Sequence, residues 1–192
     1  MKIGLMGGSF DPVHSGHLVA ARNAIKQHGL DRVIFIPAAQ AAQRSPANAI
    51  SGNHRIAMLR EAIDGENQLE VSDYELSTGC VSYTINTVRH FRKKFPDDEL
   101  FWIIGSDKVP SLGHWRSIEE IGTLAEFIVL ERPGHPPTSP PTSPRLRLHH
   151  CEGPQINISS TELKDRLRNG ISLENLLPTQ ALSYVHKNGL YA

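Results

Sequence analysis

The chain has 192 residues, of which 39% are hydrophobic, and this is enough apolar material to bury the core of one domain. Its 20 Lys and Arg residues balance its 20 Asp and Glu residues, so its charge favours neither a nucleic acid nor a membrane surface, and we expect a small-molecule substrate. Cys80 and Cys151 form no C-x-x-C pair, which argues against a disulfide framework or a zinc knuckle. No apolar run approaches the roughly 18 residues that span a bilayer, and no leader precedes the first strand, so we expect a cytoplasmic protein.

Runs of apolar, β-branched residues alternate with runs of helical period along nearly the whole chain. This alternation is typical of α/β proteins, in which helices cover both faces of a parallel sheet. We therefore predict a Rossmann-like, doubly wound parallel sheet in a single domain over residues 1–192, with a small helical C-terminal part over 157–192. A Pro-rich stretch at 133–144 is expected to be an extended or mobile connector. The strands are expected at 2–6, 32–36, 69–73, 99–104, 126–131 and 145–149, and the helices at 18–28, 53–63, 82–95, 117–122, 160–168 and 179–188.

The stretch GGSFDPVHSGH, residues 7–17, forms the turn between the first strand and the first helix. Gly7 and Gly8 have no Cβ atom, so the backbone is expected to bend sharply and to approach a ligand closely. His14 and His17 lie three residues apart at the head of the helix, where N–H groups and the helix dipole favour an anion. This spacing indicates a polyphosphate cradle. One alternative is that the glycines form a plain turn. Another is that the two histidines are half of a metal site, although no nearby residue supplies a third ligand. The dinucleotide-binding fingerprint fits poorly, because the glycines do not match G-x-G-x-x-G.

Parallel sheets of this kind bind ligands at the carboxyl ends of their strands, where the strand order reverses. The first strand leads into residues 7–17, and the strand at 99–104 leads into Gly105, Ser106 and Asp107. We expect both loops to face the same crevice. The polar loop at 38–50 follows the second strand, and by the same rule we expect it to form a mobile lid over the substrate.

The residues at 7–17 resemble the signature of the HxGH nucleotidyltransferases, and within them they are most similar to the bacterial nicotinate-nucleotide adenylyltransferases. The resemblance extends over nearly the whole chain, to the ending Asn188-Gly189-Leu190-Tyr191. It implies that His14, His17 and Lys164 are catalytic. It also implies a set of residues that bind ATP: Gly7, Gly8, Ser9, Phe10, His14, His17, Gly105, Asp107, Ile158, Ser159, Ser160 and Thr161.

Residues 158–164 open a helix, and on their own they are typical of a capping box with Ser159 as N-cap and Glu162 three residues later. The resemblance implies that this Ile-Ser-Ser-Thr helix start also holds the ATP phosphates. The chain departs from the family at Lys164, where relatives mostly have Arg. Lysine keeps the charge but lacks the planar fork, so we expect weaker positioning of ATP without loss of the reaction.

Three stretches bear on the second substrate. The resemblance assigns the nicotinate carboxylate to Tyr83 and Thr84 at a helix start, an arrangement that favours an acid over an amide. It assigns stacking on the pyridine ring to Trp115, for which core packing is the alternative. It assigns the mononucleotide phosphate to Arg44, in a loop that lacks two prolines found in relatives and is therefore less preorganised.

The resemblance as a whole implies transfer of AMP from ATP to nicotinate mononucleotide, giving nicotinate adenine dinucleotide and pyrophosphate in NAD biosynthesis. The expected cofactor is Mg²⁺ carried by ATP, with no metal ligands from the protein. The alternatives are an adenylyltransferase for nicotinamide mononucleotide or another phosphate acceptor, such as pantetheine phosphate, and a degenerate nucleotide-binding sensor. The sequence is compatible with a homo-oligomer and does not specify the oligomeric state.

Overall fold

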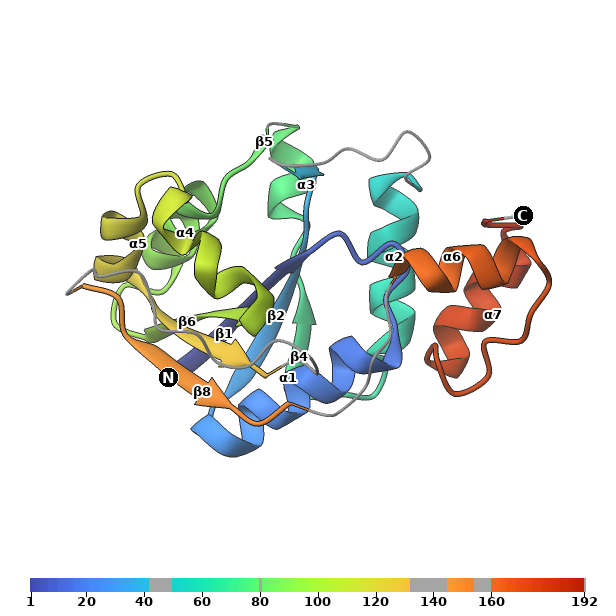
Figure 1. The fold of residues 1–192 in the computed structure, drawn as a ribbon, viewed down its shortest axis with the longest axis horizontal. Coiled ribbons are helices and arrows are strands. Elements are labelled where there is room, and N and C mark those ends of the chain that lie inside the picture. The colour runs from blue at the N-terminus through green and yellow to red at the C-terminus, as the bar shows by residue number, and fades with distance from the viewer. Residues whose placement is uncertain (42–49, 80, 132–144, 154–159, 192) are drawn as a thin grey trace.

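The computed structural model describes residues 1–41, 50–79, 81–131, 145–153 and 160–191. Within them, six parallel strands form one sheet in the order β4-β2-β1-β6-β7-β8, with β1 at its centre (Figure 1). The predicted doubly wound parallel sheet is therefore confirmed. The strands are β1 (Lys2–Gly8), β2 (Arg32–Pro37), β4 (Leu69–Val71), β6 (Glu99–Gly105), β7 (Glu126–Leu130) and β8 (Leu148–Cys151).

The strand order reverses between β1 and β6. From β1 the chain builds outward through β2 to β4, and from β6 it builds in the opposite direction through β7 to β8. Leu5 of β1 lies beside Trp102 of β6, and Gly7 lies beside Ile36 of β2. The loops that leave β1 and β6 therefore emerge next to each other at one edge of the sheet, where such folds bind their ligands.

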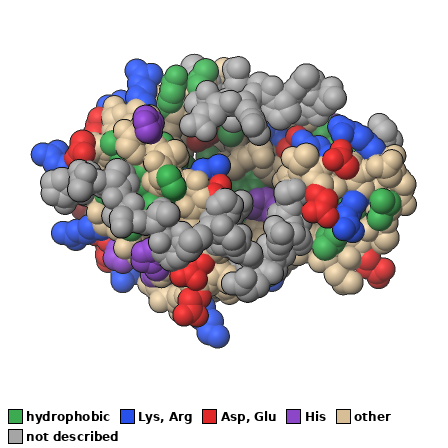
Figure 2. Space-filling model, viewed as in Figure 1, with side chains coloured by type: hydrophobic (Ala, Val, Ile, Leu, Met, Phe, Trp, Pro, Cys, Tyr) green, Lys and Arg blue, Asp and Glu red, His purple; other side chains and the backbone are tan. Residues whose placement is uncertain are grey.

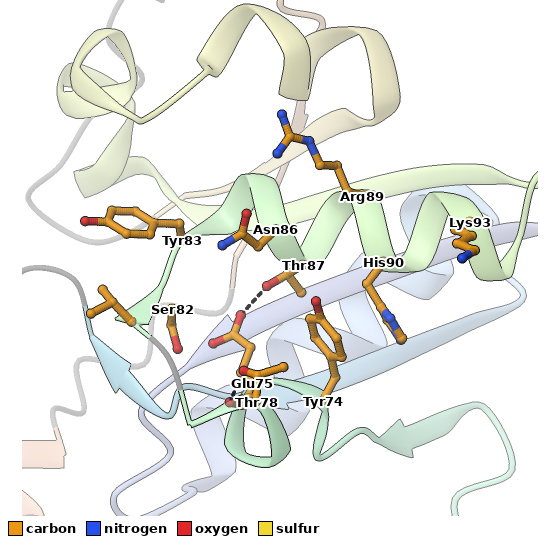
Figure 3. Close-up of a pocket in the computed structure, with 11 residues that line it drawn as sticks. Tyr74, Glu75, Thr78, Ser82, Tyr83, Asn86, Thr87, Arg89, His90 and Lys93 are labelled. Carbon is orange, nitrogen blue, oxygen red and sulfur yellow. Dashed lines mark hydrogen bonds between the residues drawn. The ribbon is translucent and has the colours of Figure 1, made fainter.

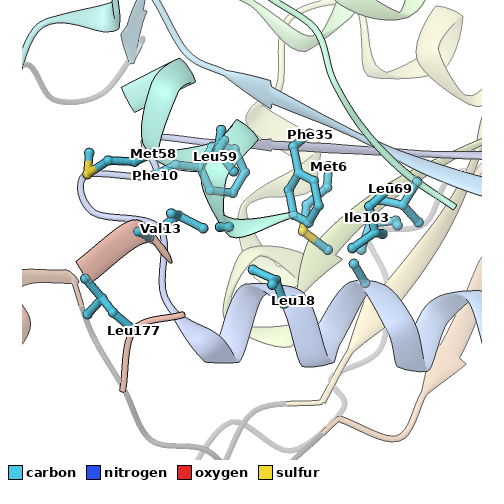
Figure 4. Close-up of a cluster of buried hydrophobic side chains, with 14 of the residues drawn as sticks. Met6, Phe10, Val13, Leu18, Phe35, Met58, Leu59, Leu69, Ile103 and Leu177 are labelled. Carbon is cyan, nitrogen blue, oxygen red and sulfur yellow. The ribbon is translucent and has the colours of Figure 1, made fainter. Parts of the chain in front are cut away.

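Helices cover both faces of this sheet. On one face α1 (Ser15–His28) and α2 (Gly52–Ala62) pack over a core that contains Met6, Phe35 and Leu59 (Figure 4). On the other face α4 (Thr84–Lys94) and α5 (Ile118–Leu124) pack over a second core. Burial of these apolar side chains at about 25 cal/mol per Å² is the main force that holds the layers together.

The C-terminal part consists of α6 (Ser160–Arg168) and α7 (Thr179–Lys187), which lie beside α2 at one end of the molecule (Figure 1). It shares the first core, because Leu163, Leu177 and Val185 join the same buried cluster as Phe10 and Val13. Figure 4 shows Leu177 lying beside Val13, which belongs to the loop after β1. Apolar packing therefore fixes the C-terminal helices against that loop.

Several short elements were absent from the sequence predictions. They are α3 (Tyr74–Thr78), the 3-10 helix η1 (Ser106–His114), and β3 (Gln40–Ala41), which pairs with β5 (Val81–Ser82). None of them is long enough to show a hydrophobic period. Several boundaries also differ by up to three residues. Among them, α1 begins at Ser15 rather than 18, α4 begins at Thr84 rather than 82, and the last strand lies at Leu148–Cys151 rather than at 145–149.

The last strand begins where its backbone meets β7: the carbonyl of Arg147 accepts the N–H of Phe127 at 2.9 Å, and the paired residues begin at Leu148. None of the helices in the described part of the chain is long and apolar enough to cross a membrane.

The expected connector at 133–144 and most of the expected lid at 38–50 lie outside the described residues.

Candidate active site

The two histidines lie at the start of α1, directly after the central strand. His14 is the N-cap of α1 and is buried, whereas His17 is half-buried in the first turn. Their rings stack with centroids 3.7 Å apart, and the ring of Phe10 meets His17 edge-on at 5.0 Å. In the space-filling view, histidine surface is visible in a hollow between the sheet and the C-terminal helices (Figure 2). The predicted pair is thus brought together at the edge of the sheet where β1 ends.

A hydrogen bond fixes the orientation of the His17 ring. The backbone N–H of His14 donates to Nδ1 of His17 at 3.2 Å, as in a capping box. Because Nδ1 accepts this bond, the ring proton lies on Nε2, which makes Nε2 the donor that His17 offers to a ligand. The local sequence therefore sets both the position and the tautomer of this side chain.

The expected bend at Gly7 and Gly8 is wrong. Both glycines continue β1, and neither has a positive φ. Glycine is needed at both positions because aromatic rings occupy the space of a side chain. A Cβ atom on Gly7 would lie 2.9 Å from Trp102, and one on Gly8 would lie 2.9 Å from Phe10. Phe10 as a whole residue is 1% exposed, so both its ring and its backbone lie beneath the surface of the loop. The turn itself is made by Phe10, at a φ of 47°.

The N–H groups at the head of α1 are not all available to a ligand. The backbone N–H of Ser15 donates to the carbonyl of Leu176 at 2.9 Å, and the Ser15 hydroxyl donates to the carbonyl of Asn175. Both carbonyls belong to the C-terminal part. The remaining anion site is therefore smaller than the spacing of the motif alone suggested.

Lys164 lies close to the loop that contains the histidines. Its Nζ donates to Oδ2 of Asp11 at 2.9 Å, and Ser160, one turn earlier on α6, donates to the carbonyl of Pro12 at 3.3 Å. Thr161 is exposed at the same helix start. Two of the three predicted catalytic groups thus come from the loop and α1, and the third, from α6, reaches Asp11 of the same loop. Arg44, Ile158 and Ser159 lie outside the described residues.

Gly105 and Asp107 lie where β6 passes into η1. Gly105 ends the strand in an extended conformation, and Asp107 forms an ion pair with Lys108 at 3.1 Å. Since β6 pairs directly with β1, this turn emerges next to the loop that contains the histidines, as predicted.

The predicted pyridine-binding residues come together at the start of α4. Tyr83 is the N-cap of α4, Thr84 is its first residue, and both are half-buried. The guanidinium of Arg116 lies 4.9 Å above the ring of Tyr83, which brings the end of η1 to this helix start. The neighbouring Trp115 is half-buried, with its ring 6.3 Å from Phe127. Trp115 therefore packs partly against the second core, as Tyr83 does, and remains partly exposed.

Glu75 supports this helix start from beneath. It is 6% exposed, and its Oε1 accepts a hydrogen bond from the hydroxyl of Thr87 at 2.5 Å (Figure 3). Burial raises the pKa of Glu75 above its ordinary value, although hydrogen bonds from Ser82 and Thr87 oppose the rise. Ser82 also accepts the backbone N–H of Ala39 at 2.9 Å. The carboxyl group therefore links α3, β5 and α4 to the residues that follow β2.

A cavity of about 470 Å³ lies between α3 and α4 (Figure 3). Its lining includes Ser82 and Tyr83, together with Tyr74, whose ring stacks on His90 at 3.8 Å. It does not include the histidines of α1, Trp115 or Lys164. The cavity therefore adjoins the predicted pyridine site and is distinct from the predicted ATP site.

Sequence reasoning missed several residues that shape the site. Arg55 of α2 is 6% exposed and donates from Nη1 to the carbonyl of Ser9 at 2.8 Å. Burial lowers its pKa, and the charge of Asp11 opposes that effect. Arg55 carried no sequence signal, because a lone Arg in a helix is usually solvated. The other missed residues are Asp11, Glu75 and Arg116; of these, only Asp11 lay within a motif that the sequence had singled out.

Among the residues that the structure describes, no group of three or more His, Cys, Asp and Glu side chains is arranged to hold a metal ion. Asp11 belongs to the same loop as His14, and both of its carboxylate oxygens accept hydrogen bonds from protein groups.

Known proteins resemble this chain throughout its length. The family model described as cytidylyltransferase-like matches residues 5–166. A protein of Opitutus terrae named "probable nicotinate-nucleotide adenylyltransferase" is 51% identical over 191 residues, which cover 100% of this chain and 98% of the relative. A protein of the same name from Halalkalibacterium halodurans is 40% identical, over 99% of this chain and 91% of the relative.

A solved structure shares the fold. The nicotinic acid mononucleotide adenylyltransferase of Plasmodium falciparum, complexed with NaAD, superposes with a TM-score of 0.80 at 18% identity, over 99% of this chain and 97% of that chain. The chain therefore belongs to the cytidylyltransferase-like family, and within it to the nicotinate-nucleotide adenylyltransferases.

Proposed function

We propose that the protein transfers AMP from ATP to nicotinate mononucleotide, forming nicotinate adenine dinucleotide and pyrophosphate in NAD biosynthesis. The observation that carries this proposal is the pair formed by His14 and His17 at the edge where β1 and β6 end, with Lys164 close to the same loop. Three cationic or N–H donor groups around one helix start suit a polyphosphate. The names of the relatives support the same activity.

The reaction needs no nucleophile from the protein. An oxygen of the mononucleotide phosphate, already an anion at pH 7, attacks the α-phosphorus of ATP. The new bond joins that oxygen to phosphorus as the bond from the α-phosphorus to the bridging oxygen breaks, and pyrophosphate leaves with the electron pair. Catalysis then consists of alignment and charge stabilisation. We assign these roles to Nε2–H of His17, to His14 and to the ammonium of Lys164.

We propose that Mg²⁺ accompanies ATP and neutralises charge on its phosphate oxygens. No residue of this chain is assigned to the ion. Asp11, a carboxylate of the same loop, holds Lys164 and is therefore not offered as a ligand.

The acceptor pocket is assigned to the start of α4. Backbone N–H groups beside Tyr83 and the Thr84 hydroxyl would hold the pyridine carboxylate, and the exposed part of Trp115 would stack on the ring. An amide would bring N–H donors toward N–H donors and leave buried groups unpaired, at a cost of about 1–3 kcal/mol. The acid should therefore be the better substrate.

Pyrophosphate release from ATP, measured with each acceptor in turn, tests this proposal. We expect kcat/KM for nicotinate mononucleotide to exceed that for nicotinamide mononucleotide by at least tenfold, in line with that cost (about 1.4 kcal/mol per tenfold). Equal rates, or faster release with the amide, would contradict the assigned pocket. Turnover with pantetheine phosphate would assign a different acceptor, and ATP binding without turnover would indicate a sensor.

A further inference from the structure

Asp11 is the centre of a buried cluster, and the proposed reaction assigns no role to Asp11 itself. It is 3% exposed, and its two carboxylate oxygens have different partners. The ammonium of Lys164 donates to Oδ2 at 2.9 Å, and the hydroxyl of Tyr191 donates to Oδ1 at 2.7 Å. Both partners belong to the C-terminal part, 153 and 180 residues along the chain from Asp11.

Tyr191 is built to be a permanent donor in this cluster. The residue is 7% exposed. It adopts a φ of 69°, a backbone conformation that residues other than glycine rarely adopt. Burial raises the pKa of its phenol far above the ordinary range, and the hydrogen bond to Asp11 and the charge of Asp11 raise it further. The hydroxyl therefore keeps its proton near neutral pH, and it donates to Asp11.

The cluster fixes the ammonium of Lys164 with respect to the histidines. Lysine has a flexible stem with several rotatable bonds, so its charge is poorly positioned unless a partner holds it. Here the Asp11 carboxylate holds it, at a side-chain exposure of only 13%. Oδ1 of that carboxylate would lack a partner without Tyr191, and a buried charge in that state reorients or draws in water.

We propose that Tyr191 is a positioning residue for ATP: it holds Asp11 so that Asp11 presents the ammonium of Lys164 to the phosphates. This rests on the proposed function only in assigning Lys164 to the ATP phosphates. The alternative is that Tyr191 merely docks the C-terminal part. The structure offers a control in Tyr184 of α7. Its hydroxyl also joins the C-terminal part to another helix, because it lies 2.9 Å from Nδ1 of His54 in α2. Among the described residues, Tyr184 has no hydrogen bond to Asp11, Lys164 or Tyr191.

The test compares Tyr191→Phe with the control Tyr184→Phe. For each variant, the KM values for ATP and for the mononucleotide, the Kd of ATP by calorimetry, and Tm are measured. We expect Tyr191→Phe to raise both the KM and the Kd of ATP by at least fivefold and to leave the KM of the mononucleotide unchanged. Tyr184→Phe should leave all three values unchanged at a similar loss of Tm.

A second background separates positioning from docking. If Tyr191 acts through Lys164, Tyr191→Phe should have no further effect on the Kd of ATP once Lys164→Met has been introduced. Asp11→Asn breaks the same link from the loop, should raise the Kd of ATP in the same way, and replaces Tyr191→Phe if that variant is too unstable to purify. An unchanged Kd of ATP in Tyr191→Phe, or an equal effect in the Lys164→Met background, would overturn the proposal. Because the Kd needs no acceptor, a failure of the proposed function would appear separately, as absent pyrophosphate release in the wild type.

Discussion

Replacement of His17 by Asn separates the two roles of that side chain, which are to accept a hydrogen bond at the helix start and to donate one to the phosphates. The carboxamide oxygen of Asn branches from Cγ as Nδ1 of histidine does, so it can still accept the N–H of His14, a bond of 3.2 Å in the wild type. Asn has no atom in the place of Nε2 and therefore loses the donor assigned to the phosphates. Ala loses both the acceptor and the donor.

The expected magnitudes differ for activity and for stability. Removal of one donor to developing transition-state charge typically costs about 2.7–4 kcal/mol, or roughly 100- to 1,000-fold in turnover. Both His17→Asn and His17→Ala should show this loss. The capping bond contributes about 0.5–2 kcal/mol to the free energy of unfolding, so His17→Asn should be more stable than His17→Ala by that amount.

Pyrophosphate release and urea-induced unfolding should be measured on the same preparations. His28→Asn is the matched control, because His28 lies at the opposite end of α1 and should tolerate the same substitution without loss of turnover. A His17→Asn variant whose turnover stays within threefold of the wild type would refute the role of Nε2. If both variants were inactive and equally destabilised, His17 would be a capping residue whose loss disrupts the loop.

Three further predictions follow from packing and charge. Trp115→Ala should raise the KM of both mononucleotides by a similar factor of about ten. Ring stacking is worth about 1–3 kcal/mol, and it does not depend on whether the ring carries an acid or an amide group. Steady-state kinetics that show an effect on only one mononucleotide would contradict this. Burial raises the folded-state pKa of Glu75, so the wild type binds a proton on folding and loses stability as the pH rises from the ordinary glutamate pKa through the raised one. Glu75→Gln should lack this loss, and urea unfolding curves that shift in parallel with pH for the two proteins would argue against it. Gly8→Ala should lower the free energy of unfolding by about 1–3 kcal/mol, because the new methyl group overlaps Phe10; a wild-type Tm in that variant would mean that Phe10 moves freely.

The sheet, its helices and the pair formed by His14 and His17 could all be predicted, because each has a local signal. Alternating apolar runs indicated the strands, and the HxGH spacing placed both rings at one helix start. The reversal of strand order between β1 and β6 agreed with the expectation that their loops share a crevice.

The rest depended on contacts between residues far apart in the chain. No local pattern could indicate that Gly7 accommodates Trp102 of the neighbouring strand, or that Leu176 would accept the N–H of Ser15. Glu75 had the appearance of an ordinary surface carboxylate in a short polar stretch, and only the packing of α3 against α4 buries it. Sequence patterns thus located the chemical groups, whereas tertiary packing decided how many of them remain open to a ligand.

The wide separation in the chain between the β1 loop and its partners has a consequence for biosynthesis. Proteins are made from the N-terminus at about 5–20 residues per second, so about 9–36 s pass between the synthesis of Asp11 and that of Tyr191, 180 residues later. By then all six strands, which end at Cys151, have been made and can pair. A chain still lacking α6 and α7 would have its whole sheet, but the Asp11 carboxylate would have neither the ammonium of Lys164 nor the phenol of Tyr191. The ribosome thus makes the loop after β1 among the first segments of the protein, whereas the contacts that hold Asp11 in that loop form among the last.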